Sequence, residues 1–126
     1  MKKKIFIVDD DAFFSSMMED FLSNNPLFDV HHFPTGEECL RNLFENPDAI
    51  VLDYNLNGQN EDAANGLEIL KQIKKVLPAV HVILLSSQTH YGVAATTIKE
   101  GAEQYVIKDK DAFKQVNSIL RDLLRL

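Results

Sequence analysis

Five short apolar runs recur along this chain of 126 residues, and they alternate with segments of helical spacing. The runs are Ile5 to Val8, Phe28 to Phe33, Ala49 to Leu52, Val80 to Leu85 and Tyr105 to Ile107. Three of the runs lack polar alternation, which is typical of strands that are covered on both faces. The pattern therefore predicts short strands buried inside the molecule.

The segments that follow the runs carry apolar residues at the spacing of amphipathic helices. These residues are Phe14, Met18, Phe21 and Leu22; Leu40, Leu43 and Phe44; Leu67, Leu70, Ile73 and Leu77; Val93, Thr97 and Ile98; and Phe113, Val116, Leu120 and Leu123. Turn residues such as Pro47, Pro78 and Gly101 end the stripes. Strand and helix alternate five times, which predicts an α/β fold with a doubly wound, five-stranded parallel sheet and five helices.

The order of the strands does not follow from periodicity. We expect the order 2-1-3-4-5, which is one of the common doubly wound arrangements and is called flavodoxin-like. No Gly/Ser linker, repeat or low-complexity tract interrupts the chain. Residues 1–126 are therefore expected to form a single domain, with no output domain in this chain.

Composition excludes several classes of partner, since the formal net charge is −6 and the pI is about 5.1. Nucleic-acid backbones bind clustered Lys and Arg, so we expect no direct nucleic-acid binding. The apolar run from Ile5 to Val8 is too short for a signal peptide or a membrane span. Cys39 is the single cysteine, which excludes an intramolecular disulfide and makes a reduced cytoplasm the expected location.

Residues capable of chemistry stand where the strands are expected to end. They are Asp9, Asp10 and Asp11 after the first run, Asp53 after the third, Ser86 and Ser87 after the fourth, and Lys108 after the fifth. Ligands of such sheets bind outside the carboxyl ends of the strands. Clustered carboxylates repel one another unless a cation balances them, and a ligand set of oxygen atoms alone favours Mg²⁺.

A carboxylate, a divalent metal, a hydroxyl and a lysine are the parts that phosphoryl transfer needs. Asp53 would attack phosphorus and form an acyl phosphate, while Mg²⁺ and Lys108 neutralise charge on the transferring oxygens. Ser86 would donate a hydrogen bond to one of those oxygens. The residues thus predict a site for phosphoryl transfer at this edge of the sheet.

Four short motifs stand in order at the expected strand ends. They are Asp9-Asp10 after Ile-Phe-Ile-Val, Val-Leu-Asp53-Tyr-Asn55, Leu-Leu-Ser86-Ser87 and Tyr105-Val-Ile-Lys108. Together they resemble the receiver domain of two-component response regulators, of the chemotaxis-regulator type, over essentially the whole chain. The resemblance implies that Asp53 is the phosphoacceptor and that the donor is a phosphohistidine of a sensor histidine kinase or a phosphotransfer protein.

The resemblance also implies how Mg²⁺ is held. Asp10 and Asp53 would bind the ion through their side chains, Asn55 through its backbone carbonyl, and Asp9 largely through bound water. Asp11 stands just before the first helical stripe, where an acidic side chain commonly caps the helix. A register in which Asp10 and Asp11 are the metal pair stays open at this point.

Further roles follow from the same resemblance. Ser86 and Tyr105 resemble the switch pair of the family, in which the hydroxyl moves toward the phosphate and the ring rotates into the vacated space. Lys108 resembles the lysine that contacts the phosphate. Gln88 and Asn55 match positions that tune autodephosphorylation. Ser87, adjacent to the switch position, is an alternative to Ser86 because strand ends are not defined by sequence to a single residue.

The chain departs from the family pattern at two places. Asp109 follows Lys108, where receivers usually carry a proline, commonly with a cis bond, so the loop is expected to be strained or differently shaped. The segment from Leu56 to Gly66 replaces a shorter loop. It is interpreted either as a tolerated surface insertion or as a lid or partner-recognition loop.

We therefore expect a phosphorylation-dependent signalling domain, monomeric or dimeric on phosphorylation, that catalyses its own phosphorylation and dephosphorylation and turns over no separate substrate. Phosphorylation would shift an existing equilibrium between an inactive and an active state and so switch contacts with an effector that is not identified.

The alternatives are a partner-binding pseudo-receiver and a small Mg²⁺-dependent phosphatase with an aspartyl-phosphate intermediate. Such phosphatases usually carry a general acid two residues past the nucleophile, and here that residue is Asn55. A flavin domain is disfavoured because no Gly/Ser/Thr-rich loop follows the first strand.

Overall fold

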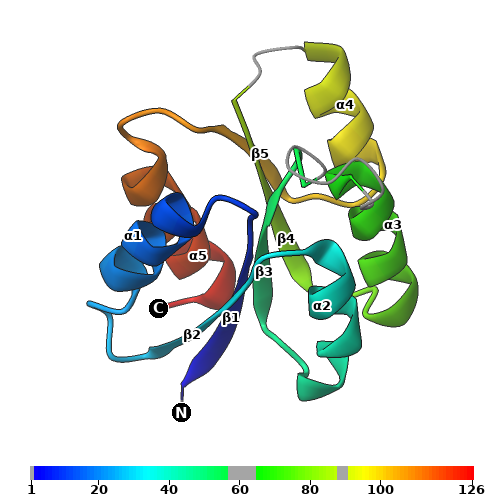
Figure 1. Ribbon diagram of the computed structural model, residues 1–126. Coiled ribbons are helices and arrows are strands. Elements are labelled where there is room, and N and C mark those ends of the chain that lie inside the picture. Colours follow the sequence, from blue (N-terminus) through cyan, green and yellow to red (C-terminus); the bar gives the residue numbers. More distant parts are fainter. Residues whose placement is uncertain (1, 57–64, 88–90) are drawn as a thin grey trace.

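The computed structural model describes residues 2–56, 65–87 and 91–126 and contains one parallel sheet between two layers of helices (Figure 1). The strands are β1 (Lys3–Val8), β2 (Phe28–Phe33), β3 (Ala49–Asp53), β4 (His81–Ser86) and β5 (Gln104–Ile107). Their order is β2-β1-β3-β4-β5, and every neighbouring pair is parallel. The predicted fold class and strand order are confirmed.

Helices connect the strands and cover both faces of the sheet. They are α1 (Ala12–Leu22), α2 (Gly36–Arg41), α3 (Gly66–Val76), α4 (Tyr91–Lys99) and α5 (Ala112–Leu124), with a short 3₁₀ turn η1 (Leu43–Glu45) after α2. Figure 1 shows α1 and α5 on one face, and α2, α3 and α4 on the other. Within the described residues, no helix is long and apolar enough to cross a membrane.

Each face of the sheet packs against its own hydrophobic core. One core contains Met18 of α1, Val51 of β3 and Val116 of α5, and the other contains Leu52 of β3 and Ile73 of α3; all five side chains are fully buried. Successive residues of β3 thus serve opposite cores, because side chains alternate across a strand. This two-sided burial explains why the central strands lack polar residues.

The strand register brings the predicted site residues to one edge of the sheet. β1 lies beside β3 with Val8 paired to Leu52, so the next residues along the two strands, Asp9 and Asp53, emerge together. On the other side of β3, the register of β4 and β5 pairs Ser86 with Ile107, the residue before Lys108. The carboxyl edge therefore gathers groups from four strand ends.

The second helix is shorter than its apolar stripe predicted. Asn42 leaves the helix, since its backbone N–H donates to the carbonyl of Cys39 three residues back at 3.0 Å. Leu43 then begins η1 and is buried, but Phe44 is 76% exposed. The interpretation of Phe44 as part of a buried helical stripe was wrong, because the tighter 3₁₀ geometry turns it away from the core.

Gly66, the first residue of α3, packs directly on the backbone that follows β3. A Cβ atom at this position would lie 2.5 Å from the Asp53 carbonyl oxygen and 2.6 Å from Tyr54 Cα. The Gly66 N–H also donates to the Tyr54 carbonyl at 2.9 Å. Because the main chain at Asp53 has little room to yield, we expect Gly66→Ala to lower the free energy of unfolding by about 1–3 kcal/mol in urea denaturation.

The matched control is Gly92→Ala in α4. A Cβ atom there meets nothing within 4 Å. Replacing an exposed helical glycine by alanine is expected to leave stability unchanged or to raise it by up to about 1 kcal/mol. Equal unfolding midpoints for the two alanine variants would contradict the close approach at Gly66.

Candidate functional site

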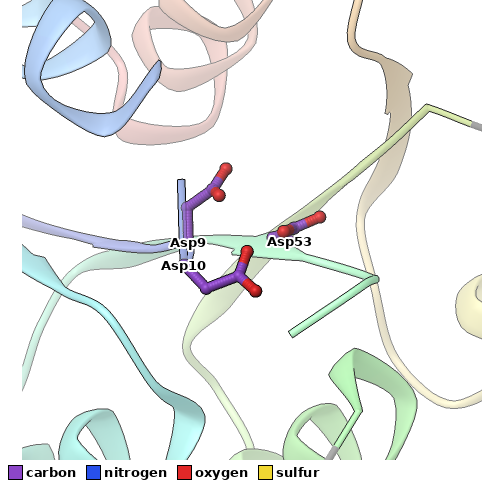
Figure 2. A group of neighbouring side chains, drawn as sticks. All are labelled: Asp9, Asp10 and Asp53. Carbon is purple, nitrogen blue, oxygen red and sulfur yellow. The ribbon is translucent and has the colours of Figure 1, made fainter. Parts of the chain in front are cut away.

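Three carboxylates meet at the carboxyl edge of the sheet. Asp9, Asp10 and Asp53 each offer a carboxylate oxygen, and these atoms all lie within 4.8 Å of one another (Figure 2). Asp9 and Asp53 are buried, and Asp10 is half-buried. The sequence prediction of an acidic cluster formed by the first and third strands therefore matches the arrangement in the structure.

The turn after β1 separates the cluster from the start of α1. The Asp9 N–H donates to the Phe33 carbonyl at 3.1 Å, which extends the pairing of β1 with β2 by one residue. The side chain of Asp9 accepts the N–H of Asp11 at 2.9 Å, and Asp11 in turn accepts the N–H of Phe14 at 3.1 Å. Asp11 is thus the N-cap of α1, as predicted, and the alternative metal pair of Asp10 and Asp11 is not what the fold brings together.

Two further side chains hold the backbone of Asp9, and sequence reasoning did not identify either of them. His32 Nε2 lies 3.2 Å from the Asp9 carbonyl oxygen, and Ser15 Oγ donates to the same oxygen at 3.4 Å. A carbonyl only accepts, so the contact places the proton of His32 on Nε2. His32 comes from β2, and identifying its role requires the register of β1 and β2, which short-range sequence patterns do not contain.

Asp53 ends β3 and is nearly fully buried, with its side chain 3% exposed. Its Oδ1 accepts the backbone N–H of Asn55 at 3.1 Å, which closes the first turn after the strand. The Tyr54 N–H donates to the carbonyl of Leu85 in β4 at 2.8 Å. These bonds hold the Asp53 carboxylate at the sheet edge and place Asn55 next to it.

Lys108 extends from the end of β5 into the cluster. Its Nζ lies 2.8 Å from Asp9 Oδ2 and 3.4 Å from Asp53 Oδ2. The Lys108 backbone N–H donates to the Ser86 carbonyl at 2.8 Å, so the lysine begins where the β4–β5 pairing ends. The ammonium group therefore bridges the two buried carboxylates.

Asp109, which stands where the resemblance implies a proline, shapes the loop after Lys108 by hydrogen bonds. Its N–H, a group that proline lacks, donates to the Ile107 carbonyl at 2.9 Å. Its side chain accepts the Asp111 N–H at 2.9 Å. The described residues contain no cis peptide bond. Hydrogen bonds of Asp109 thus define the turn that leads from β5 to α5.

Burial and charge act in opposite directions on the ionisable groups of the cluster. Burial raises the pKa of Asp53 from 3.8 to about 6, with a further increase from Asp9, while Lys108 and the Asn55 N–H lower it. Burial lowers the pKa of Lys108, but the hydrogen bond to Asp9 and the charge of Asp53 outweigh it, and the net shift is upward. The site thus holds more negative charge than its lysine neutralises.

The donor set fits a hard divalent cation. All the converging ligand atoms are carboxylate oxygens, which Mg²⁺ prefers. The partner of Asp9 Oδ2 is the Lys108 ammonium, at 2.8 Å. Asp9, Asp10 and Asp53 could therefore hold Mg²⁺ between their carboxylates.

Mg²⁺ is expected to stabilise the folded protein. A ligand that binds only the native state adds about 2.7 kcal/mol at one hundred times its dissociation constant. Thermal unfolding in MgCl₂ should therefore shift to higher temperature than in NaCl of equal ionic strength, and EDTA should reverse the shift. The same increase in both salts would show that screening alone, and not a bound cation, relieves the carboxylates.

The predicted switch residues lie on neighbouring strands at the same face of the sheet. Ser86 is the buried last residue of β4, and Tyr105 is half-buried in β5. The register pairs Tyr105 with Leu84, and Ser86 follows Leu84 by two positions, so Ser86 and Tyr105 share the face that α2, α3 and α4 cover. Ser87 lies just past the strand and is exposed. Gln88 and residues 57–64 of the long segment lie outside the described residues.

Comparison with known proteins gives one consistent family. A family model described as the response regulator receiver domain matches residues 5–119. The protein-glutamate methylesterase/protein-glutamine glutaminase 1 of Carboxydothermus hydrogenoformans is 35% identical over 120 residues, which cover 92% of this chain and 34% of that protein. The chemotaxis protein CheY of Thermotoga maritima is 27% identical over 109 residues, which cover 86% of this chain and 87% of that one.

A solved structure agrees with these relatives. The BeF3-activated DrrB receiver domain matches with a TM-score of 0.87 and 28% identity, and the match covers 100% of both chains. The chain thus spans about a third of the methylesterase but most of CheY. With the family model matching nearly the whole length and the strand order confirmed, the chain belongs to the receiver domain family of two-component response regulators.

Proposed function

We propose that Asp53 accepts a phosphoryl group from a phosphohistidine of a sensor histidine kinase or phosphotransfer protein, and that the modification switches contacts with a downstream protein. One observation carries this proposal: the buried Asp53 carboxylate lies among Asp9, Asp10 and the ammonium of Lys108. It is supported by the family, whose members interact with histidine kinases and effectors. We place this activity in the cytoplasm and treat residues 1–126 as one receiver domain.

The residues around Asp53 would divide the chemistry of transfer between them. An Asp53 carboxylate oxygen forms a bond to phosphorus while the phosphorus–nitrogen bond of the donor breaks, and the donor nitrogen keeps that electron pair. Lys108 lies close enough to Asp53 to neutralise charge on the transferred oxygens. Asp10 and Asp53, with the Asn55 carbonyl and water bound to Asp9, would hold Mg²⁺, which supplies further positive charge to those oxygens.

Ser86 and Tyr105 would connect phosphorylation to the surface. The Ser86 hydroxyl would turn to donate a hydrogen bond to the new phosphoryl oxygens, and the Tyr105 ring would rotate into the space that this movement leaves. Their position on adjacent strands, with Tyr105 half-buried, supports this coupling. The affected surface would comprise β5, which contains Tyr105, together with α4 and α5, which cover opposite faces of the sheet.

The test of this function uses acetyl phosphate as a small donor. The purified protein is incubated with acetyl phosphate and MgCl₂, and its intact mass is followed with time. We expect the mass of one phosphoryl group to be added in MgCl₂ and no addition in EDTA. A wild-type protein that takes up no phosphoryl group in MgCl₂ would overturn the proposal and leave the partner-binding pseudo-receiver.

The same samples discriminate the phosphatase alternative. A receiver modifies itself, so turnover of a simple aryl phosphate should stay at the level of a buffer blank. Asn55 has a side-chain amide where such phosphatases usually have an acid, and the hydrogen bond that Asn55 donates to Asp53 comes from its backbone N–H. Steady multiple turnover of the aryl phosphate would favour the phosphatase instead.

A further inference from the structure

Lys108 contacts an aromatic ring in addition to the two carboxylates. Its Nζ lies 4.6 Å from the centroid of the Phe14 ring. An ammonium within about 6 Å of a ring centroid is attracted by the negative face of the π system. The Lys108 side chain is only 17% exposed, so this attraction acts where little water screens it. Phe14 is thus a third attractive contact for the charge at the end of Lys108.

Two helices determine where the Phe14 ring lies. Its backbone N–H is bound by the N-cap Asp11 at the start of α1. Its ring packs on Phe113 of α5, with centroids 5.3 Å apart and planes tilted by 53°. Phe113 also contacts Phe21, two turns farther along α1, at 5.8 Å. The ring that faces Lys108 therefore belongs to a cluster that joins α1 to α5.

The contact matters because the other two partners of Lys108 are the predicted metal ligands. When Asp9 and Asp53 turn toward a divalent cation, their attraction for the ammonium is shared, and the cation itself repels Lys108. Lysine has a flexible stem of four methylene groups, so weaker ion pairs would let the ammonium move away. A phenyl ring offers no oxygen to Mg²⁺, and its attraction for Lys108 is not shared.

We propose that Phe14 is a positioning residue, whose ring keeps the Lys108 ammonium beside Asp53 during phosphoryl transfer. This inference rests on the proposed function of Asp53. Phe14 touches no transferred atom and acts only through Lys108. The proposal adds an apolar residue of α1 to the acidic cluster and the lysine as a contributor to phosphoryl transfer.

The test compares variants that change the ring and its surroundings separately. Phe14→Leu keeps an apolar side chain against Phe113 but removes the π face, whereas Phe14→Tyr keeps the face. The initial rate of phosphoryl uptake from acetyl phosphate at saturating Mg²⁺ should fall between about 2-fold and 30-fold in Phe14→Leu. Phe14→Tyr should restore most of that loss. Mg²⁺ affinity, measured by titration, should be the same in both variants.

Phe21→Leu is the matched control. It removes a ring from the same cluster, and within the described residues the ring contact to Lys108 is made by Phe14 alone. We expect Phe21→Leu to react at nearly the wild-type rate. A rate as low as that of Phe14→Leu would show that packing of α1 on α5 is responsible, and would overturn the proposal.

A double variant shows whether Phe14 acts through Lys108. In a Lys108→Met background, Phe14→Leu should cause no further loss, since the group that it positions is absent. The same factor of loss in both backgrounds would overturn the proposal, as would a Phe14→Leu rate equal to that of the wild type. A wild type that takes up no phosphoryl group would overturn the proposed function and this inference with it.

The contact between Lys108 and Phe14 can also be tested in the wild-type protein by NMR, where the result does not depend on whether a variant folds. The ε-methylene protons of Lys108, assigned by their loss in Lys108→Arg, should resonate upfield of ordinary lysine signals, because the Nζ atom bonded to that methylene lies over the Phe14 ring at 4.6 Å from its centroid. Wild-type signals at the ordinary lysine position would show that the contact does not form in solution.

Discussion

Replacing Asp53 with asparagine is expected to abolish phosphoryl uptake from acetyl phosphate, with a loss of more than about 100-fold. An amide oxygen is a far weaker nucleophile than a carboxylate and cannot give a stable acyl phosphate. The substitution is nearly isosteric, and the new side-chain amide could still accept the Asn55 N–H that Asp53 accepts at 3.1 Å. Intact mass after incubation with MgCl₂ and donor measures the effect.

Two asparagine variants separate the nucleophile from a ligand and from the surface. Asp20 is exposed on α1, and Asp20→Asn should take up phosphoryl groups as the wild type does. Asp10→Asn should react slowly and recover when MgCl₂ is increased, because Asp10 would bind metal without forming the new bond. Uptake by Asp53→Asn at the wild-type rate would contradict the assignment of Asp53.

The same substitution is expected to stabilise the protein when no divalent metal is bound. Burial and the charge of Asp9 raise the pKa of Asp53 from 3.8 to about 6, in spite of Lys108. An acid whose pKa is raised in the folded state favours unfolding once it is ionised. At about 1.4 kcal/mol per pKa unit, relief of this penalty would add roughly 3 kcal/mol to the free energy of unfolding at pH 8.

The pH dependence distinguishes this effect from a change in packing. Between the unfolded pKa of 3.8 and the folded pKa of about 6, the folded protein binds more protons than the unfolded chain. Stability of the wild type from this group therefore falls as pH rises through that window, and the penalty is complete above it. The advantage of Asp53→Asn should be small near pH 4 and largest above pH 7.

Urea denaturation in EDTA at several pH values measures this advantage, with Asp20→Asn as the control for removal of a carboxylate. Saturating MgCl₂ should reduce or reverse the stability advantage of Asp53→Asn. The metal stabilises the wild type, whereas the variant lacks one of the metal ligands. A wild type more stable than Asp53→Asn in EDTA at pH 8 would contradict this expectation. It would show that the ion pair of Asp53 with Lys108 outweighs the repulsion from Asp9 and the cost of burying the charge.

The chain pattern was sufficient for the layers of the fold and for the acidic cluster. Uninterrupted apolar runs such as Ala49 to Leu52 become strands because both faces of β3 are covered. The carboxyl ends of parallel strands share an edge, so Asp9 and Asp53 were expected near each other once the first and third strands were taken as neighbours, which the strand order confirms. The cap at Asp11 was predictable because helix starts are local.

Other features depend on contacts that local patterns do not contain. His32 and Phe14 support the site from β2 and α1, and both look like ordinary residues until the register and the helix packing are known. The exposure of Phe44 follows from the 3₁₀ turn after α2, which a stripe at helical spacing does not reveal. The loop at Asp109 is closed by hydrogen bonds of the backbone and side chain of this residue. The resemblance implies a proline at this position, so it did not predict these bonds.

The most direct test of phosphorylation at Asp53 locates the phosphoryl group on the chain. The phosphorylated wild type is treated with borohydride, which reduces an acyl phosphate to an alcohol, and the peptides are then sequenced by mass spectrometry. We expect Asp53, buried beside Asp9 and Lys108, to be the residue converted to homoserine. Conversion at Asp9 or Asp10 with Asp53 intact, or a phosphoryl group that stays on Ser86, would contradict this assignment.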